Sequence, residues 1–454
     1  MKGTIAERWL AEGRKPQFLI AAPTSGSGKT TVSRGLMALL VRKGLKVQPF
    51  KCGPDYIDTK YHAAVCGRPS VNLDSFMASA SHVRRIYARY AAGADACIVE
   101  GMMGMYDGYD RDRGSSAEIA RLLRLPVVLV VDAKSAAYSM APLLAGFIGF
   151  RPDVRIAGVI FNRVGSARHY ALLQEVCAEL DVPCLGYLPK RAELEQGSRY
   201  LGLDFSCSRG TDAIGLLADL LEEHVDCDRL LADTCLPAVE PADGQPQLPG
   251  DKHILVARNE DAFSFIYQEH IDMLRGMGRV TFFDPEQPFT LPADTDLLYL
   301  PGGYPEKHIR QLMQAKSTVA SIRRYAEEGG RVLAECGGMI YLSAGIWQDG
   351  DDAQAAPRFD PMVGLFPFAI SNRKQHRRLS LGYRRFDYGG QQLSGHEFHY
   401  TQFVTDGDRP LPVSVAAVCN ARGEAVDTPV FRYKNTLASY THLYWGETDI
   451  WKLF

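Results

Sequence analysis

The chain has 454 residues, more than one hydrophobic core usually serves, so two or three domains are expected. Hydrophobic residues make up 46% and charged residues 23%, as in ordinary globular proteins, and a formal net charge of −2 excludes a general field that attracts nucleic acid. The N-terminus has no apolar signal core and no uncharged stretch is long enough to span a bilayer, so we expect a cytoplasmic protein without a membrane anchor.

The first half of the chain alternates short apolar runs with amphipathic or Ala/Leu-rich segments. The strand-like runs are QFLIAAP, KVQPFK, ACIVEG, PVVLVVDA and IAGVIFN. This alternation predicts an α/β domain whose helices cover both faces of a parallel sheet. We place this domain at 1–232 and expect a linker at 233–250, where Pro, Asp and Gly are frequent and apolar periodicity is lost.

The first strand leads into APTSGSGKTT and then into a helical pattern. In a P-loop, backbone N–H groups bind phosphate oxygens, the lysine reaches the terminal phosphates, and the next hydroxyl binds Mg²⁺. Pro23 stands where the strict pattern has its first glycine, so this loop is a variant. The motif predicts a nucleotide-phosphate site. Its residues are Ser25, Gly26, Ser27, Gly28, Lys29, Thr30 and Thr31.

Polar side chains follow three later strands of this domain. KCGPDYID contains Asp55 and Asp58, and CIVEG ends in Glu100. Carboxylates at the C-terminal ends of parallel strands face the ligand crevice, where with Thr30 they are suited to hold Mg²⁺. Solvated turn acids are the alternative, above all for Asp58. Asn162, at the end of GVIFN, is a weaker candidate for hydrogen bonding to a base edge.

Strand-like runs resume at HILVARN, RVTFFDP, LLYLPGG and RVLAEC, with later candidates in GHEFHYTQF and TLASYTH. They predict a second α/β domain at 251–454 with a parallel or mixed sheet.

Cys336 stands between an apolar run and a glycine pair in RVLAECGGMIYL. The ten cysteines include no C-x-x-C pair, so each is by default a small buried hydrophobe and no zinc site is expected. A strand before Cys336 and a helix after it would stabilise a thiolate at the helix N-terminus. Backbone N–H groups near Gly303 and Gly337 can stabilise an oxyanion, and His442 can act as base. The spacing therefore favours a nucleophile that hydrolyses a carboxamide through a thioester.

Several segments, in this order, resemble the cobyrinate a,c-diamide synthase family, glutamine-dependent amidoligases of corrinoid biosynthesis. They are SGSGKTT, KCGPDYID, VEGMMGMYDG, ARNEDAFSFIY, LPGGYPE, AECGGMIYL, GHEFHY and ASYTHLYW, and they extend from about residue 17 to 450. The resemblance implies an N-terminal synthetase domain similar to dethiobiotin synthetase and a C-terminal class I-type glutaminase domain. ATP would activate substrate carboxylates, and glutamine would supply ammonia.

For the first domain, the resemblance implies that Lys29 and the loop amides hold ATP while Thr30, Asp55 and Glu100 position Mg²⁺. A side-chain carboxylate of the macrocycle would attack the γ-phosphate and become an acyl phosphate. The resemblance also implies contact with the macrocycle or the reaction intermediate for Tyr56, Asp58 and the segment RYLGL at 199–203.

For the second domain, the resemblance implies that His442 takes the proton of Cys336 and that the thiolate attacks the glutamine amide. Two rounds would give the a,c-diamide, and we expect ammonia to travel without entering bulk water. Common class I glutaminases carry a Glu two residues after the histidine, where this chain has Tyr444, so the third member of the triad is open. We take His396 and His399 to lie on one strand face, and favour a core or interface strand over a metal site because no third ligand is spaced to join them.

Alternative functions remain open from sequence. The same chemistry on hydrogenobyrinate or nickel-sirohydrochlorin is one, and no residue identifies the macrocycle. A nucleotide-dependent switch of the partitioning ATPase type is another, although Thr24 stands where such switches carry an extra lysine. A synthetase without amidation is disfavoured by Cys336 and His442. The sequence also leaves the oligomeric state open, a homodimer included.

Overall fold

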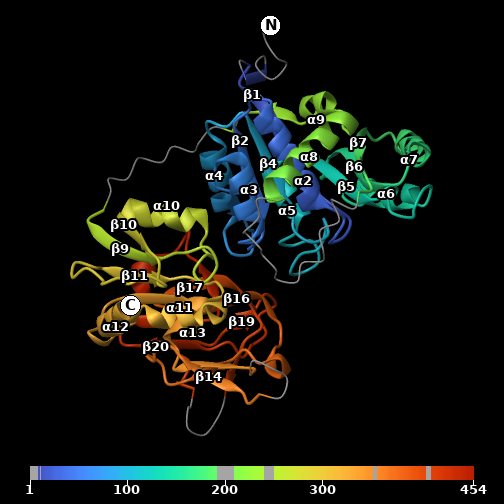
Figure 1. Cartoon of the computed structure of the whole chain (residues 1–454). Coiled ribbons are helices and arrows are strands. Elements are labelled where there is room, and N and C mark those ends of the chain that lie inside the picture. Colours follow the sequence, from blue (N-terminus) through green and yellow to red (C-terminus); the bar gives the residue numbers. More distant parts are fainter. Residues whose placement is uncertain (1–8, 11, 192–208, 240–249, 351–354, 405–410) are drawn as a thin grey trace. The chain divides into compact units, whose positions relative to one another are not determined.

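The structure is a computed structural model of the chain and describes residues 9–10, 12–191, 209–239, 250–350, 355–404 and 411–454 (Figure 1). The chain divides into two compact units. Unit 1 comprises Met1–Ser75 and Ser79–Gly244, and unit 2 comprises Phe76–Ala78 and Gln245–Phe454. Among the helices in the described ranges, none combines the length and the apolarity needed to cross a membrane.

Unit 1 contains the predicted parallel sheet, with strand order β3-β2-β4-β1-β5-β6-β7 (Figure 1). All neighbours on this path are parallel, and β8 adds an antiparallel pair at the start of β1. The strands are β1 Arg14–Ala21, β2 Val47–Cys52, β3 Val71–Leu73, β4 Ala96–Glu100, β5 Val127–Asp132, β6 Ile156–Val164, β7 Cys184–Pro189 and β8 Cys235–Pro237. The helices are α2 Lys29–Arg42, α3 Asp58–Cys66, α4 Ala80–Ala91, α5 Ser116–Leu123, α6 Met140–Gly149, α7 Ala167–Glu179, α8 Arg209–His224 and α9 Cys227–Asp233.

The apolar runs form strands because both of their faces are covered. Phe18, Leu19 and Ile20 of β1 alternate in direction, yet each is fully buried. On one face Phe18 and Ile20 join a core cluster with Leu36 of α2 and Leu221 of α8. Burial of each such side chain contributes about 1.5–3 kcal/mol, so the run behaves as a central strand.

The prediction of an irregular linker from residue 233 is wrong for Cys235–Pro237, which form β8. This strand pairs with β1 in the register Arg14 to Pro237 and Pro16 to Cys235. Side chains reinforce the pairing, since Arg14 Nη2 donates to the carbonyl of Cys235 at 2.8 Å and Gln17 Nε2 donates to that of Pro237 at 2.8 Å. Residues 240–249 of the predicted linker lie outside the described residues.

Unit 2 has a central sheet of order β10-β9-β11-β12-β21-β20, in which only β20 is antiparallel to its neighbour. Two smaller sheets have the orders β14-β13-β15-β18 and β19-β16-β17-β22. The central strands are β9 Lys252–Ala257, β10 Gly278–Phe283, β11 Leu297–Leu300, β12 Val332–Glu335, β20 Val430–Tyr433 and β21 Thr436–Ser439. The others are β13 Gly345–Gln348, β14 Arg358–Pro361, β15 Ala369–Ser371, β16 Ser380–Tyr388, β17 Gln391–His399, β18 Gln402–Val404, β19 Cys419–Asn420 and β22 His442–Tyr444. The helices are α10 Gln268–Met277, α11 Ile309–Gln314, α12 Lys316–Glu327 and α13 Gly337–Leu342, with 3₁₀ turns η2 Pro305–Lys307, η3 Lys374–His376 and η4 Ile450–Leu453.

The segment TLASYTH, predicted as one strand, contributes to two sheets. β21 pairs with β12 in the central sheet, whereas β22 pairs with β17 in a smaller one. The chain changes sheet across Tyr440 and Thr441, both of which are buried. His442 therefore begins a strand of a smaller sheet, three residues after Ser439, which pairs with the last residue of β12.

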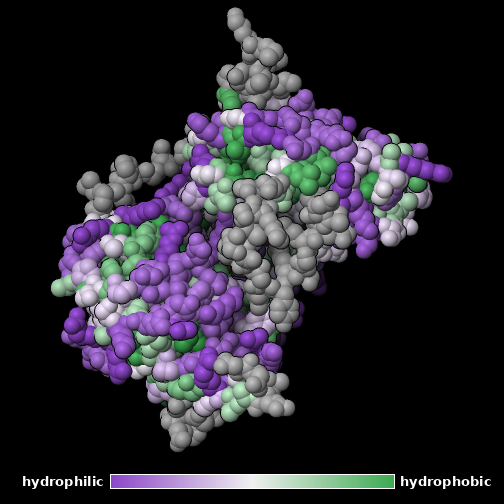
Figure 2. Space-filling view, in the orientation of Figure 1, coloured by the Kyte–Doolittle hydropathy of each residue, from purple (hydrophilic) through white to green (hydrophobic). Residues whose placement is uncertain are grey.

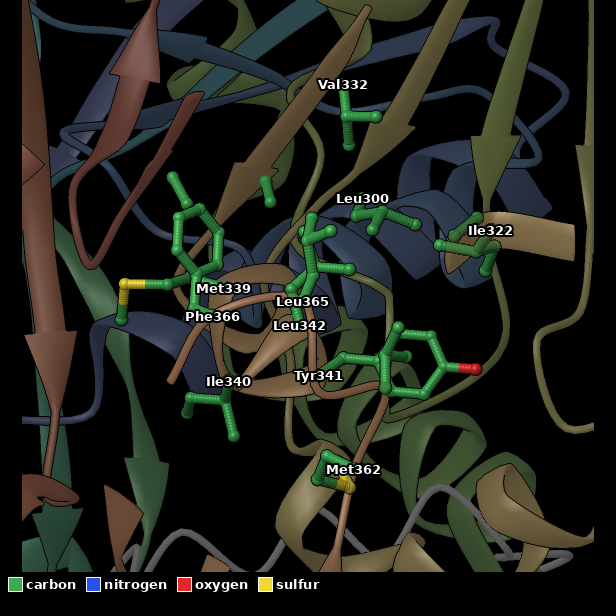
Figure 3. Close-up of a cluster of buried hydrophobic side chains, with 14 of the residues drawn as sticks. Leu300, Ile322, Val332, Met339, Ile340, Tyr341, Leu342, Met362, Leu365 and Phe366 are labelled. Carbon is green, nitrogen blue, oxygen red and sulfur yellow. The ribbon is translucent and has the colours of Figure 1, made fainter. Parts of the chain in front are cut away.

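The short helix α13 is held by the core of unit 2. Met339, Ile340, Tyr341 and Leu342 have at most 2% of their surface exposed. Figure 3 shows their side chains grouped with those of neighbouring core residues, Leu365 and Phe366 among them. Dense packing of this kind tolerates little displacement, so the residue that precedes α13 is fixed in position.

The surface agrees with the mixed composition of the chain. Figure 2 shows hydrophilic residues over most of the visible face, with hydrophobic residues in small separate groups.

Candidate active sites

The P-loop of unit 1 connects β1 to α2 and depends on two glycines with left-handed backbone. Gly26 has φ 78° and Gly28 has φ 102°. A Cβ at Gly28 would lie 2.1 Å from Nδ2 of Asn162, so this position has no room for a side chain. Within the loop, Ser27 Oγ donates to the carbonyl of Thr24 at 2.9 Å. Backbone N–H groups at the start of α2 are therefore positioned for an anion.

Lys29 and Thr30 are the first two residues of α2. The Lys29 ammonium donates to the carbonyl of Met103 and lies 3.5 Å from that of Thr24. Thr30 Oγ1 donates to Glu100 Oε1 at 2.7 Å, so the predicted pair of Thr30 and Glu100 is in direct contact. Of the remaining predicted loop residues, Ser25 is exposed and Thr31 is half-buried.

A buried charge cluster lies at the ends of β2 and β4. These strands are neighbours, and their register places Lys51 opposite Glu100. Lys51 Nζ lies 2.9 Å from Glu100 Oε1 and 2.8 Å from Asp58 Oδ2, while His62 Nε2 lies 2.7 Å from Glu100 Oε2. All four side chains have at most 4% of their surface exposed. Asp58 is thus an ion-pair partner rather than the solvated turn acid considered as its alternative.

The cluster stabilises Lys51 and Glu100 in their charged forms. Burial alone would lower the pKa of Lys51, but the carboxylates of Glu100 and Asp58 raise it above its usual value. Burial likewise opposes ionisation of Glu100, yet Lys51 and His62 hold the pKa of that carboxyl well below its usual range. Sequence reasoning missed Lys51 and His62, although Lys51 opens the quoted segment KCGPDYID directly at a strand end.

Asp55 and Tyr56 lie beside this cluster. Asp55 Oδ1 accepts hydrogen bonds from the N–H groups of Ile57 at 2.7 Å and Asp58 at 2.8 Å, which orders the start of α3. Tyr56 is buried. The segment at 199–203, predicted to contact substrate, lies outside the described residues.

The oxygens at this site suit Mg²⁺ that arrives with a nucleotide. Among the described residues, no group of three or more His, Cys, Asp or Glu side chains is arranged to hold a metal by itself. Nucleotide-bound Mg²⁺ needs only one or two protein oxygens, because phosphates and waters complete its octahedron. Thr30 Oγ1 and Glu100 Oε1, 2.7 Å apart at the P-loop, fit that requirement.

The end of β6 supports the P-loop from the other side. Asn162 Nδ2 donates to the carbonyl of Ser27 at 3.0 Å, and its Oδ1 accepts from the N–H of Arg163 at 2.9 Å. Arg163 Nη2 donates to the carbonyl of Gly26 at 2.8 Å and pairs with Asp132 at 2.7 Å. Asn162 therefore has a structural role in shaping the loop, and contact with a nucleotide base stays a prediction.

In unit 2, Cys336 forms a sharp turn between β12 and α13. Its backbone has φ 46° and ψ −103°, a conformation that side-chain-bearing residues rarely adopt and that costs about 1–3 kcal/mol. The Cys336 N–H donates to the carbonyl of Ser439 at 2.7 Å, which ties the turn to the end of β21. Strain held by the surrounding structure is typical of a functional residue.

Strand order brings the glycine loop and the histidine to this turn. β12 lies between β11, which leads to Gly302 and Gly303, and β21, which leads to His442. A Cβ at Gly337 would lie 2.9 Å from both N and O of Gly303. A Cβ at Gly302 would lie 2.1 Å from Cε1 of His442. The glycines thus allow the cysteine turn, the loop and the imidazole to pack directly against one another.

The protonation states differ from the expected thiolate. Burial and the nearby charge of Glu306 raise the pKa of the Cys336 thiol, and the opposing N–H of Gly337 is too weak to offset them. Burial, with His396 and His399 nearby, lowers the pKa of His442 to about 3. At neutral pH the pair is therefore a thiol with a neutral imidazole.

A glutamate on the nucleophile strand connects Cys336 to the histidine strand. Glu335 Oε1 accepts from the N–H of Leu443 at 3.1 Å, and its Oε2 accepts from the Tyr299 hydroxyl at 2.7 Å. Burial raises the pKa of Glu335 to about 8. Tyr444, at the position of the usual triad glutamate, donates to Glu269. Glu335 thus fixes the residue next to His442 through the backbone.

The expectation that His396 and His399 share a strand face is wrong, because residues three apart on a strand point to opposite faces. His396 is half-buried and lies opposite His442 in the β17–β22 register. His399 is buried, with Nε2 2.6 Å from Glu397 Oε1 and Nδ1 2.7 Å from the carbonyl of Thr401. These contacts agree with the preferred interpretation of a core strand.

Comparison with known proteins covers both units. Residues 18–201 match the family model of the CobQ/CobB/MinD/ParA nucleotide binding domain, and residues 253–450 match that of the CobB/CobQ-like glutamine amidotransferase domain. A cobyrinate a,c-diamide synthase of Caldanaerobacter subterraneus subsp. tengcongensis is 38% identical over 441 residues, covering 94% of this chain and 94% of the relative. A hydrogenobyrinate a,c-diamide synthase of Brucella anthropi is 40% identical over 440 residues, covering 94% of this chain and 98% of the relative.

Proposed function

Because the chain belongs to the family of cobyrinate and hydrogenobyrinate a,c-diamide synthases, we propose that it amidates the a and c side-chain carboxylates of a corrinoid with ATP and glutamine. The observation that carries the proposal is the assembly of Cys336, the Gly302–Gly303 loop and His442 at one sheet end. A nucleotide-binding loop alone would serve many functions. The assembly in the same chain adds a site suited to releasing ammonia from glutamine.

In unit 1, the loop amides and Lys29 bind the ATP phosphates, and Thr30 and Glu100 are the residues that would hold Mg²⁺. When bound, that ion would supply positive charge to offset the charge of the phosphates. A carboxylate of the macrocycle attacks the γ-phosphate in line, and ADP leaves as the acyl phosphate forms. The chain's contribution is orientation and charge, since phosphoryl transfer needs little covalent chemistry from the protein.

In unit 2, neutral His442 takes the thiol proton as the sulfur of Cys336 attacks the amide carbon of glutamine. Backbone N–H groups near Gly303 and Gly337 stabilise the tetrahedral oxyanion. The imidazolium returns its proton to the leaving ammonia, and water then hydrolyses the thioester to glutamate. Ammonia attacks the carbonyl carbon of the acyl phosphate, and inorganic phosphate leaves as the amide forms. We expect the ammonia to be kept from bulk water, where it would be protonated.

The macrocycle is the open part of the proposal. Relatives named for cobyrinate and for hydrogenobyrinate are 38% and 40% identical to this chain, so identity does not separate the two substrates. We propose cobyrinate first, with hydrogenobyrinate and then nickel-sirohydrochlorin as the alternatives. The partitioning ATPase alternative leaves residues 253–450 without a role.

The test is product mass after incubation with each macrocycle, Mg-ATP and glutamine. The wild-type protein should convert two carboxylates of the macrocycle to amides. Cys336→Ala should do so only when ammonium is supplied, because this variant has lost the glutaminase nucleophile and keeps the synthetase site. Lys29→Ala should fail with either nitrogen source. A wild type that hydrolyses glutamine yet modifies none of the three macrocycles would overturn the substrate assignment.

A further inference from the structure

A half-buried glutamate that neither half of this mechanism uses lies on the loop beside Cys336. Glu306 is in the 3₁₀ turn η2, which follows the Gly302–Gly303 loop. A Cβ at Gly337 would lie 2.9 Å from Cδ of Pro305, so this turn packs against the residue after the nucleophile. After burial, the charge of Glu306 is the largest cause that raises the pKa of the Cys336 thiol. The carboxyl therefore lies close to the sulfur.

One oxygen of this carboxyl has no protein partner among the described residues. Glu306 Oε2 is shielded from solvent and accepts no hydrogen bond. The hydroxyl of Tyr304, on the same loop, is also buried without a hydrogen bond, and its pKa is raised by burial and then by Glu306. An unpartnered buried oxygen costs about 1–3 kcal/mol, and a charged group costs more. Two such atoms from one loop indicate that a ligand supplies the missing donors.

The backbone of this turn is held in place by a side chain from another element. Gln348 Nε2 donates to the backbone carbonyl of Glu306 at 3.0 Å. Two cations, Lys307 and Arg377, act on this carboxyl and lower its pKa, but burial outweighs them. Lys307 Nζ lies 3.9 Å from the centre of the Tyr304 ring and 3.6 Å from Asp261 Oδ2. Neither cation donates a hydrogen bond to Glu306 Oε2.

The chemistry of the two atoms selects the ligand. A carboxylate and a phenol oxygen accept N–H donors from a cation, and a single carboxylate is too few ligands for Mg²⁺ or Ca²⁺. An amino acid whose side-chain carboxamide is held at Cys336 carries a primary ammonium only a few bonds away. We propose that Glu306 and Tyr304 form the subsite that binds the α-ammonium of glutamine. This proposal rests on the glutaminase activity of the proposed function.

The test compares glutamine with glutaramate, the same molecule without its α-amino group, as substrates for ammonia release. Wild type should use glutamine more efficiently by about 10- to 100-fold in kcat/KM, the range for one charge-assisted hydrogen-bonded contact. In Glu306→Gln the ratio of kcat/KM for glutamine to that for glutaramate should fall to near 1, mainly through the KM for glutamine, because any effect of the lost charge on the Cys336 thiol acts on both substrates alike. Tyr304→Phe, which removes only a hydroxyl, should reduce the preference for glutamine over glutaramate by a smaller factor than Glu306→Gln does.

Two controls separate this proposal from a structural effect and from the proposed function. Glu286→Gln removes another partly buried carboxyl of unit 2, which already has Asn259 at 2.9 Å and His308 at 3.0 Å as partners, and should keep the glutamine preference. Ammonium-dependent amidation should be unchanged in Glu306→Gln. If it is unchanged and the variant still prefers glutamine by the wild-type ratio, the subsite is wrong and the proposed function stands. If wild type releases no ammonia from glutamine, both fall.

Discussion

Lys51→Met tests whether the buried charge cluster of unit 1 holds that unit together. The substitution keeps an unbranched side chain of similar length and removes the ammonium that lies 2.9 Å from Glu100 and 2.8 Å from Asp58. Both carboxylates then remain in a site with at most 4% exposure. Loss of one partner of a buried ion pair costs about 3–5 kcal/mol, because the other charge stays desolvated.

The assay is calorimetric unfolding of the full chain, since two units are expected to give separable transitions. For a unit of this size, 1 kcal/mol shifts Tm by roughly 2–4 °C, so the unit 1 transition should fall by about 6–20 °C while that of unit 2 is unchanged. Lys51→Met with Asp58→Asn should recover part of the loss, because one of the two stranded charges is removed.

The pH dependence gives a second check with a defined sign. In wild type the pKa of Glu100 is held below its usual range, so its stabilising contribution is present above pH 4.5 and is lost as pH falls. Without Lys51 the buried carboxylates favour protonation, so the difference between variant and wild type should shrink on acidification. A Tm within about 2 °C of wild type at pH 7, or a difference that grows toward low pH, would refute the reasoning.

Three further predictions concern unit 2. Gly302→Ala places a Cβ 2.1 Å from Cε1 of His442, so glutamine-dependent amidation should fall at least about 100-fold while the ammonium-dependent rate persists, as product mass would show. Burial raises the pKa of Glu335 to about 8, so wild-type unit 2 should lose stability as pH rises from about 4.5 through 8, and Glu335→Gln should flatten that dependence in calorimetric scans. Burial also raises the pKa of Glu306 to about 7, with smaller effects from Lys307, Asp261 and Arg377. If ionised Glu306 binds the ammonium, KM for glutamine should rise as pH falls below about 7, and a KM for glutaramate with the same dependence would contradict this.

The sheets and both loops were predictable from sequence because their signals are local. Runs such as FLIAA and VVLVV are apolar without alternation, which fits only strands covered on both faces. The loops GSGKTT and AECGG are recognisable from a few adjacent residues. Their glycines stand where the backbone has a positive φ or where a side chain would collide with a neighbour.

The charge cluster was not predictable because it depends on strand order. Lys51 and Glu100 are far apart in the chain and meet only because β4 inserts between β2 and β1 in the sheet. Cys336 shows a second limit, since the acidity of its thiol depends on how deeply the turn is buried and on Glu306. His396 and His399 show a simple error of period, because strand faces repeat every two residues and these are three apart.

The pairing of β8 with β1 has an evolutionary consequence. Arg14 and Pro237 are partners at the start of β1, so the first and the last strand of unit 1 lie together, although Phe76–Ala78 between them belong to unit 2. A segment whose two ends meet in this way can be exchanged between genes, or circularly permuted, with little disturbance to its interior. The nucleotide-binding half therefore has the architecture of a transferable cassette, which natural recombination can join to a different nitrogen donor or a different acceptor while its phosphate chemistry is kept.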